Sequence, residues 1–116
     1  MNPRVFSRAV KVLFVCNQGR HRSRTAAELF AKEFETAYAG LYSDRPVTER
    51  QLAWADLVLV MEDAQRTELS KRFPKLYLQK RILSLDVPDV YSYGQPELVR
   101  RLRTALAATL QTAASQ

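Results

Sequence analysis

Three short apolar runs divide the chain into strand-like segments separated by amphipathic ones. Residues 10–16 (VKVLFVC), 57–61 (LVLVM) and 81–85 (RILSL) are apolar and rich in branched side chains. Such runs are typical of strands buried on both faces of a parallel sheet. Residues 36–39, ending at Gly40, indicate a fourth strand less clearly, because the same residues could extend the helix before them.

Apolar residues recur at helical spacing after the first run. The pattern predicts a helix over residues 23–34, with Ser23 as its cap. Further along, Thr48-x-x-Gln51 has the form of a capping box and predicts a short helix that runs towards Trp54.

The second half of the chain predicts two more helices. A charged amphipathic segment over residues 62–73 is expected to end at Pro74. Pro96 suits the first turn of a last helix, and residues 112–116 are expected to fray. Four residues at a spacing of four give that helix an apolar face: Leu98, Leu102, Leu106 and Leu110.

Strands that alternate with helices predict an α/β fold. We expect a small three-layer sandwich, with a four-stranded parallel sheet and helices on both faces, formed by a single domain over residues 1–116. Ligands of such sheets bind beyond the carboxyl ends of the strands. The three clear strands end at Cys16, Met61 and Leu85, so the loops that follow them should meet at one edge.

The charge and the cysteine content indicate which partners, metal sites and cellular compartments the sequence favours. The chain carries a net charge of +6, with 18 Lys and Arg against 12 Asp and Glu, which favours an anionic partner such as a phosphorylated substrate or nucleic acid. Cys16 is the single cysteine, so an intrachain disulfide is impossible, and a lone His21 argues against a structural zinc site. No apolar run approaches the ~18 residues of a membrane span, and we find no signal peptide. We therefore expect a cytoplasmic protein.

The segment between the first strand and the first helix carries the candidate chemistry. It reads Cys16, Asn17, Gln18, Gly19, Arg20, His21, Arg22, Ser23, which has the form C-x5-R-S. A loop at a helix N-terminus can aim successive N–H groups at one tetrahedral oxyanion. Gly19 can supply the positive φ that such a nest needs.

Three side chains of this loop have expected roles. Arg22 can close the cradle with a bidentate fork onto two phosphate oxygens. Cys16 at the base of the loop lies in a positive field that favours the thiolate, a nucleophile at neutral pH. Ser23 can donate to that thiolate. The alternative to a catalytic role is that Cys16 is a small hydrophobic residue buried in the core. Arg20, His21 and Arg24 are expected to be loop charges that raise the local potential rather than catalytic groups.

These motifs resemble the low-molecular-weight protein tyrosine phosphatases, and a shortened bacterial branch of predicted phosphatases is more similar still. The resemblance covers roughly residues 10–110 in motif order. Beyond the C-x5-R-S loop it includes Ala39-Gly40, the strand from Asp56 to Met61, and Val87-Pro88-Asp89-Val90-Tyr91, which is similar to the segment that carries the family's general acid.

The sequence departs from the family pattern at several positions. Gln18 then Gly19 stand where the family has Gly then Asn, and His21 replaces a second cysteine, so an intraloop disulfide cannot form. Arg24 replaces a proline, and Val90 replaces the proline after the acid. The segment between residues 40 and 54 is short, which questions phosphotyrosine specificity more than phosphate-ester cleavage.

The resemblance implies a general acid in the segment after the third strand. Asp89 is the first choice and Asp86 the alternative, because both follow residues 81–85 and either could protonate a leaving oxygen. Both could also be ordinary turn residues. Tyr91 and Tyr93 either flank a flat aryl substrate or pack on the sheet edge.

The sequence therefore predicts a cysteine-dependent phosphatase that forms a phosphocysteine, without metal or cofactor, because Arg22 and the loop supply the charge. Catalysis is expected from Cys16, Arg22 and Asp89. The expected substrates are phosphate monoesters, with phosphotyrosine in proteins favoured over a small phosphate ester. The expected phosphate- and substrate-binding residues are Asn17, Gln18, Gly19, Arg20, His21, Arg22, Ser23 and Tyr91. A phosphate- or nucleic-acid-binding module without turnover is the alternative, less favoured. Arsenate reduction is disfavoured because no further cysteine could resolve the intermediate. The sequence does not indicate an oligomeric state.

Overall fold

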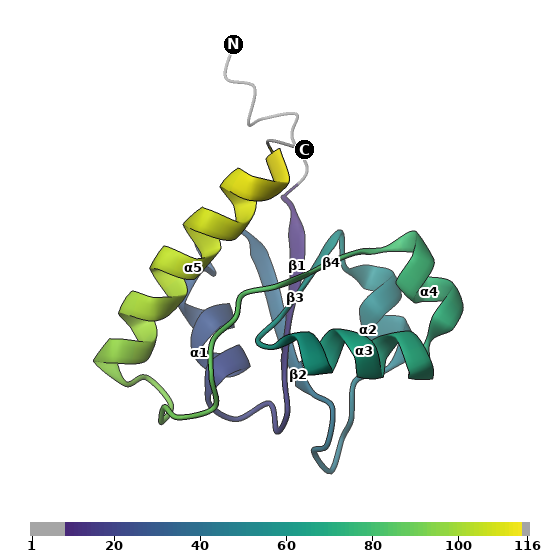
Figure 1. The fold of residues 1–116 in the computed structure, drawn as a ribbon, viewed down its shortest axis with the longest axis horizontal. Coiled ribbons are helices and arrows are strands. Elements are labelled where there is room, and N and C mark those ends of the chain that lie inside the picture. The colour runs from purple at the N-terminus through teal and green to yellow at the C-terminus, as the bar shows by residue number, and fades with distance from the viewer. Residues whose placement is uncertain (1–8, 115–116) are drawn as a thin grey trace.

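The computed structural model describes residues 9–114 and contains one four-stranded sheet, which is parallel throughout (Figure 1). The strands lie in the order β2-β1-β3-β4. The two central strands are β1 (Lys11–Cys16) and β3 (Leu57–Val60), and the edge strands are β2 (Glu35–Gly40) and β4 (Arg81–Ser84).

Helices cover both faces of this sheet. α1 (Arg22–Leu29) and α5 (Pro96–Ala114) pack on one face, while α2 (Glu49–Trp54), α3 (Asp63–Arg72) and α4 (Pro74–Gln79) lie on the other (Figure 1). This arrangement confirms the predicted three-layer α/β sandwich with a four-stranded parallel sheet.

The alternation of side chains along β1 explains the two-sided core. Val12 and Phe14 point to the layer of α1 and α5, where the Phe14 ring stacks on Phe30 with centroids 6.0 Å apart. Leu13 and Val15 point to the opposite layer. All four are fully buried, which is why this strand reads as a continuous apolar run rather than an alternating one.

The predicted apolar face of the last helix is also present. Leu98, Leu102 and Leu106 of α5 are buried in the cluster that α5 shares with α1, and Leu110 packs against its margin. The helix continues to Ala114, so the prediction that residues 112–114 fray was wrong; residues 115–116 lie outside the described part of the chain.

Two predictions about helix boundaries in the first half of the chain have different outcomes. The capping box at α2 is confirmed: the Gln51 N–H donates to Thr48 Oγ1 at 3.1 Å, and the Thr48 N–H donates to Gln51 Oε1 at 2.9 Å. The Ser23 cap was wrong, because α1 begins at Arg22 with His21 at the cap position. Ser23 lies inside the helix, where its hydroxyl approaches Cys16 instead.

Other boundaries also differ from the prediction. α1 ends at Leu29 instead of residue 34. The fourth strand is present as β2 and is longer than residues 36–39. Pro74 follows the end of α3 as predicted, but it also occupies the first turn of α4, a helix that the sequence pattern did not reveal. Proline is tolerated there because the first N–H groups of a helix have no partner within it.

The strand order places the candidate loops together. β1 connects to β2 on one side, and β3 lies on its other side, so the order reverses beside β1, where parallel α/β sheets bind ligands. The Met61 N–H donates to the Val15 carbonyl at 3.1 Å, and the Val87 N–H donates to the Met61 carbonyl at 2.7 Å. The three strand-end loops therefore meet at one edge, as predicted. Within residues 9–114, no helix has the length and apolar character that a membrane crossing requires.

Candidate active site

Cys16 lies at the base of the loop between β1 and α1 and is 3% exposed. The Gly19 N–H donates to Cys16 Sγ at 3.1 Å, and the Ser23 hydroxyl lies 3.1 Å from the same sulfur. The sulfur thus has two polar neighbours, one from the loop and one from the first turn of α1. These two polar contacts distinguish Cys16 from a hydrophobe packed only among carbon atoms.

Two glycines allow the loop to fold this tightly. Gly19 has a φ of +69°, as the sequence predicted. Gly40, at the end of β2, lies directly against the same turn, and a Cβ on Gly40 would stand 2.4 Å from the Gln18 carbonyl carbon. The close approach of these two backbones is the structural reason for glycine at position 40.

Backbone and side-chain hydrogen bonds connect the loop to the residues after β2 and to α3. The Leu41 N–H donates to the Cys16 carbonyl at 3.0 Å, and the Tyr42 N–H donates to the Asn17 carbonyl at 2.8 Å. The Asn17 side-chain oxygen accepts from Gln65 Nε2 at 3.1 Å. Gln65 is 2% exposed, and its Oε1 accepts from the N–H groups of Met61 and Glu62. Asn17 therefore supports the loop from outside the pocket.

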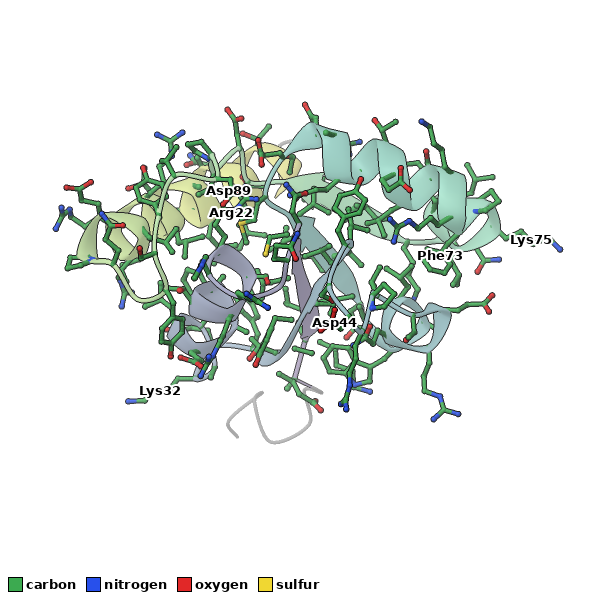
Figure 2. All side chains as sticks on the ribbon, turned by 90° about the horizontal axis from the view of Figure 1, so that it is seen from below. Arg22, Lys32, Asp44, Phe73, Lys75 and Asp89 are labelled. Atoms are coloured by element: carbon green, nitrogen blue, oxygen red, sulfur yellow. The ribbon has the colours of Figure 1, made fainter. Side chains whose placement is uncertain are left out.

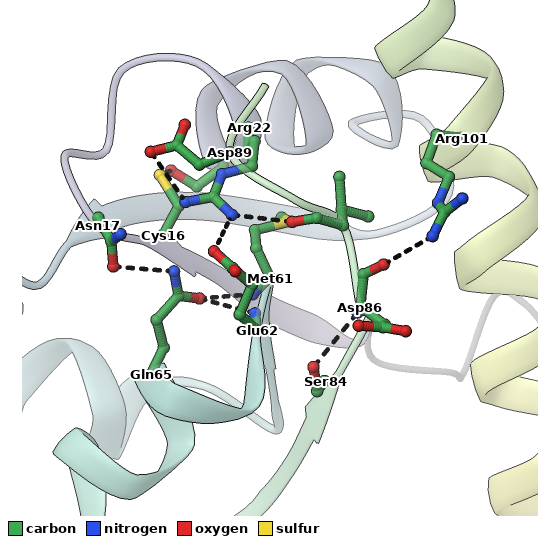
Figure 3. Close-up of polar contacts among 12 residues, drawn as sticks. Cys16, Asn17, Arg22, Met61, Glu62, Gln65, Ser84, Asp86, Asp89 and Arg101 are labelled. Carbon is green, nitrogen blue, oxygen red and sulfur yellow. Dashed lines mark hydrogen bonds and ion pairs between the residues drawn. The ribbon is translucent and has the colours of Figure 1, made fainter. Parts of the chain in front are cut away.

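The guanidinium of Arg22 is 1% exposed and has a carboxylate on two sides. Nη1 donates to Glu62 Oε1 at 2.5 Å and to the Val87 carbonyl at 2.8 Å, which uses both of its N–H groups. Nη2 lies 3.7 Å from Asp89 Oδ2. Figure 3 shows this arrangement above the ends of β1 and β3. Nη1 is thus engaged by two acceptors, while Nη2 faces the Asp89 carboxylate.

Asp89 and Asp86 lie in different surroundings. Asp89, 55% exposed, helps to line a pocket of about 130 Å³. Asp86 adopts a φ of 58° and lines a separate cavity beside α3 and α5; its carbonyl accepts from Arg101 Nη2 at 3.0 Å, away from Cys16 (Figure 3). Six residues line the smaller pocket: Cys16, Gln18, Arg20, His21, Arg22 and Asp89.

The segment that carries Asp89 is attached to α1. His21 Nδ1 accepts from the Tyr93 N–H at 3.2 Å, and Thr25 Oγ1 accepts from the Gly94 N–H at 3.0 Å. The Tyr93 hydroxyl donates to the Glu28 carboxylate. His21 thus both lines the pocket and holds the neighbouring segment.

The Glu28–Tyr93 contact changes the titration of both groups. The hydrogen bond to Glu28 raises the pKa of Tyr93, and the same bond, with help from Arg24, lowers the pKa of Glu28. The Arg24 guanidinium lies over the Tyr93 ring, 4.4 Å from its centroid. Tyr93 is therefore engaged with α1, whereas Tyr91 packs against the core and is not among the pocket-lining residues.

The structure brings most of the sequence-predicted residues together. Cys16, Arg22 and Asp89 share one pocket with Gln18, Arg20 and His21, while Gly19 and Ser23 contact the sulfur from behind. Sequence reasoning missed Glu62, Gln65 and the close packing of Gly40. Glu62 could have been found, because it follows a buried strand at the edge where ligands bind; Gln65 carries no such signal.

Comparisons with known proteins support the fold. No family model and no curated protein matches the sequence. Among solved structures, the arginine phosphatase YwlE from Geobacillus stearothermophilus aligns with a TM-score of 0.65 and 22% identity over 90% of this chain and 94% of that one. A YwlE mutant with a phosphorylated active-site serine gives 0.67 and 21% over 85% and 94%.

A third solved structure with the same fold is a low-molecular-weight protein tyrosine phosphatase. The low-molecular-weight protein tyrosine phosphatase from T. tengcongensis aligns with a TM-score of 0.70 and 19% identity, and the match covers 93% of this chain and 100% of that one. Identities this low establish architecture rather than activity. The chain therefore shares the fold of the low-molecular-weight protein tyrosine phosphatases.

Proposed function

We propose that this protein is a cysteine-dependent phosphatase that hydrolyses phosphate monoesters, with phosphotyrosine in proteins as its substrate, through a phosphocysteine intermediate. One observation carries the proposal. Cys16 Sγ, hydrogen-bonded to Gly19 N–H and close to the Ser23 hydroxyl, shares a pocket with the Arg22 guanidinium and the Asp89 carboxyl. A nucleophile, an anion-binding cation and a proton donor thus lie within one small space.

The phosphoryl group binds between the loop and Arg22. Glu62 and Val87 occupy Nη1, so Nη2 and Nε are the nitrogens that can form the bidentate fork. Loop N–H groups that point into the pocket bind the remaining oxygens. The phosphate replaces Asp89 as the neighbour of Nη2, which frees the Asp89 carboxyl to face the leaving oxygen.

The reaction proceeds in two displacements. The Cys16 thiolate attacks phosphorus, so the S–P bond forms as the P–O ester bond breaks, and the Asp89 carboxyl gives its proton to the leaving oxygen. The Asp89 carboxylate then takes a proton from water, which attacks phosphorus and releases inorganic phosphate. Ser23 stabilises the departing thiolate by donating to Sγ, from 3.1 Å away.

The neighbouring structures support the intermediate. The YwlE mutant carries its phosphoryl group on the active-site serine, which shows that this fold can hold a phosphorylated side chain there. Two of the reported neighbours are arginine phosphatases, so phosphoarginine is the control substrate beside phosphotyrosine. The proposal places the protein, as a single domain, in the cytoplasm, where the thiol stays reduced.

Hydrolysis of an aryl phosphate, scanned from about pH 5 to 8 for wild type and Cys16→Ser, tests the proposal. We expect turnover without added metal in the wild type and none in the variant. Equal turnover in both proteins would refute cysteine chemistry. If both are inert, a phosphate titration followed by the amide signals of residues 17–23 would show whether the loop only binds.

A further inference from the structure

A second groove adjoins the catalytic pocket, on the side of the loop between β2 and α2. Its volume is about 350 Å³. Gln18 and Arg20 line both the groove and the pocket, so the two spaces adjoin at the loop of residues 16–23, which we call the phosphate loop. The other lining side chains that bear on binding are Tyr38, Ser43, Asp44 and Arg45.

The groove has fixed walls. One wall is the phosphate loop, and the other is residues 40–47, which close on themselves through the bond from the Val47 N–H to the Gly40 carbonyl at 3.1 Å. Ser43 Oγ donates to the Arg45 carbonyl at 2.8 Å. The Arg72 guanidinium donates to the Leu41 carbonyl at 2.7 Å and so ties this wall to α3. The groove therefore exists before any ligand arrives.

The charges of the groove favour an anion. Arg20 and Arg45 are exposed, and neither guanidinium pairs with a carboxylate among residues 9–114. Asp44 is the one carboxylate of the lining, so arginines outnumber acids there. Most other arginines near the site are engaged: Arg22 binds Glu62, and Arg24 binds Glu28. Figure 2 looks onto this edge and shows Arg22 and Asp89 beside α1 and Asp44 on the neighbouring loop.

We propose that this groove, which we call the flanking groove, binds an acidic residue next to the phosphorylated residue of a protein substrate. The inference rests on the proposed phosphatase function. A peptide whose phosphoryl group occupies the pocket passes the shared rim at Gln18 and Arg20 and enters the groove within a few residues, since an extended chain advances about 3.3 Å per residue. Tyr38, 43% exposed, offers a flat wall along which the peptide can lie.

The test compares phosphotyrosine peptides that differ in one flanking residue. Glutamate, glutamine or lysine is stepped along both sides of the phosphotyrosine, and kcat/KM is measured with wild type, Arg45→Glu and Arg50→Glu. Arg45 lies outside the catalytic pocket, and Arg50 is an exposed residue of α2 outside the groove. The two variants thus change the net charge equally.

We expect the wild type to favour the glutamate peptide at one or more positions. Arg45→Glu should lower kcat/KM for that peptide by between about twofold and tenfold, the range expected for replacing one exposed ion pair with a repulsion. Hydrolysis of a small aryl phosphate should be unchanged. Asp44→Asn should increase the preference for glutamate.

Two results would overturn the flanking groove while leaving the phosphatase intact: equal kcat/KM for the three peptides, or equal effects of Arg45→Glu and Arg50→Glu. Peptide binding to Cys16→Ser, measured by fluorescence anisotropy, separates the two claims. Suppose that the wild type hydrolyses no peptide, but Cys16→Ser binds the glutamate peptide and loses this binding when Arg45→Glu is added. That result would refute the phosphatase proposal and support the flanking groove. An RNA oligonucleotide that displaces the peptide in an Arg45-dependent way would assign the groove to nucleic acid instead.

Discussion

Glu62 holds Arg22 in place, although the sequence gives it no motif of its own. Its carboxylate and the Val87 carbonyl bind the same guanidinium nitrogen. Without Glu62 the guanidinium can turn, and a misplacement of about 1 Å at a reacting centre can reduce the rate on the order of 100-fold. Glu62 is thus a positioning residue for the proposed reaction.

We expect Glu62→Ala to lower kcat/KM for an aryl phosphate by about 10- to 100-fold. Glu62→Gln should recover part of the loss, because an amide oxygen can still accept from Nη1. Asp63→Asn is the matched control, since the exposed Asp63 carboxylate contacts Arg66 rather than the site. Steady-state kinetics would contradict this role if Glu62→Ala and Asp63→Asn behaved alike.

The two aspartates after β4 are expected to differ in their effect on turnover. Asp89 lines the Cys16 pocket and Asp86 does not. Asp89→Asn should reduce kcat by about 10²- to 10⁴-fold for a phenyl phosphate, whose leaving oxygen needs a proton. The loss should be smaller for a nitrophenyl phosphate, whose leaving group is a weaker base. Asp86→Asn should stay near wild type. An equal loss of kcat for the phenyl and nitrophenyl phosphates would argue against proton donation by Asp89.

Contiguity in the sequence explains how much of the site could be predicted. The residues from Cys16 to Ser23 form one loop, so their type and spacing indicated their chemistry before any tertiary contact was known. Asp89 depended on the family resemblance, because Asp86 fits the same local pattern. Glu62 and Gln65 meet this loop only through the sheet, over sequence separations of 40 and 48 residues. The position of Glu62 directly after a buried strand indicates its edge of the sheet, but no local pattern indicates which residues Glu62 and Gln65 contact.

At the scale of elements, the contact between the phosphate loop and the end of β2 determines the shape of the site. Gly40→Ala would place a Cβ 2.4 Å from the Gln18 carbonyl carbon, so the loop must shift. We expect a loss of about 1–3 kcal/mol in the free energy of unfolding, as for other overpacking changes, together with loss of aryl phosphate hydrolysis.

Gly94→Ala is the control for this change. Gly94 also has a positive φ, of 70°, but an added Cβ there meets nothing within 4 Å. Gly94→Ala should lower the free energy of unfolding by about 1–2 kcal/mol through backbone conformation alone. The variant should keep its activity. Denaturant unfolding and kinetics on both variants would contradict the account if Gly40→Ala remained fully active.

The contact between α1 and the segment around Tyr93 gives a prediction about pH. The Tyr93 hydrogen bond lowers the pKa of Glu28 below its ordinary value of 4.5. A lowered pKa in the folded state adds stability above pH 4.5, and this stability is lost as the pH falls through the folded value. Glu28→Gln should therefore melt below the wild type near neutral pH, and the difference in Tm should vanish in acid. A difference in Tm that does not change with pH would contradict the assignment of this stability to the ionised Glu28 carboxylate.

The elements themselves were predictable where burial was complete. β1 and β3 are covered on both faces, so their apolar runs were unambiguous. β2 is an edge strand with mostly exposed or half-buried residues, and its pattern was correspondingly weak. α4 buries none of its six residues fully, so no apolar periodicity indicates this helix, and in the sequence Pro74 indicates only the end of the preceding one.

At the scale of the whole molecule, the sheet order assembles the site. The end of β1 supplies Cys16, the proposed nucleophile. The segments after β3 and β4 supply Glu62, which binds Arg22, and Asp89, the proposed acid, while the end of β2 packs against the loop. The net charge of +6 over the chain favours the approach of anionic molecules to the protein as a whole. The fold thus explains how residues far apart in sequence come together at one pocket.

The central claim is that the phosphoryl group passes through Cys16, and acid-quenched intact-mass analysis during turnover of an aryl phosphate tests it most directly. Asp89→Asn is the protein of choice, because the proposed base for the second step is missing and the intermediate should accumulate. The account predicts one added phosphoryl group, located at Cys16 by peptide mapping and absent from Asp89→Asn protein that also carries Cys16→Ser. Product release with no phosphoryl adduct, or an adduct that persists in the protein without Cys16, would contradict it.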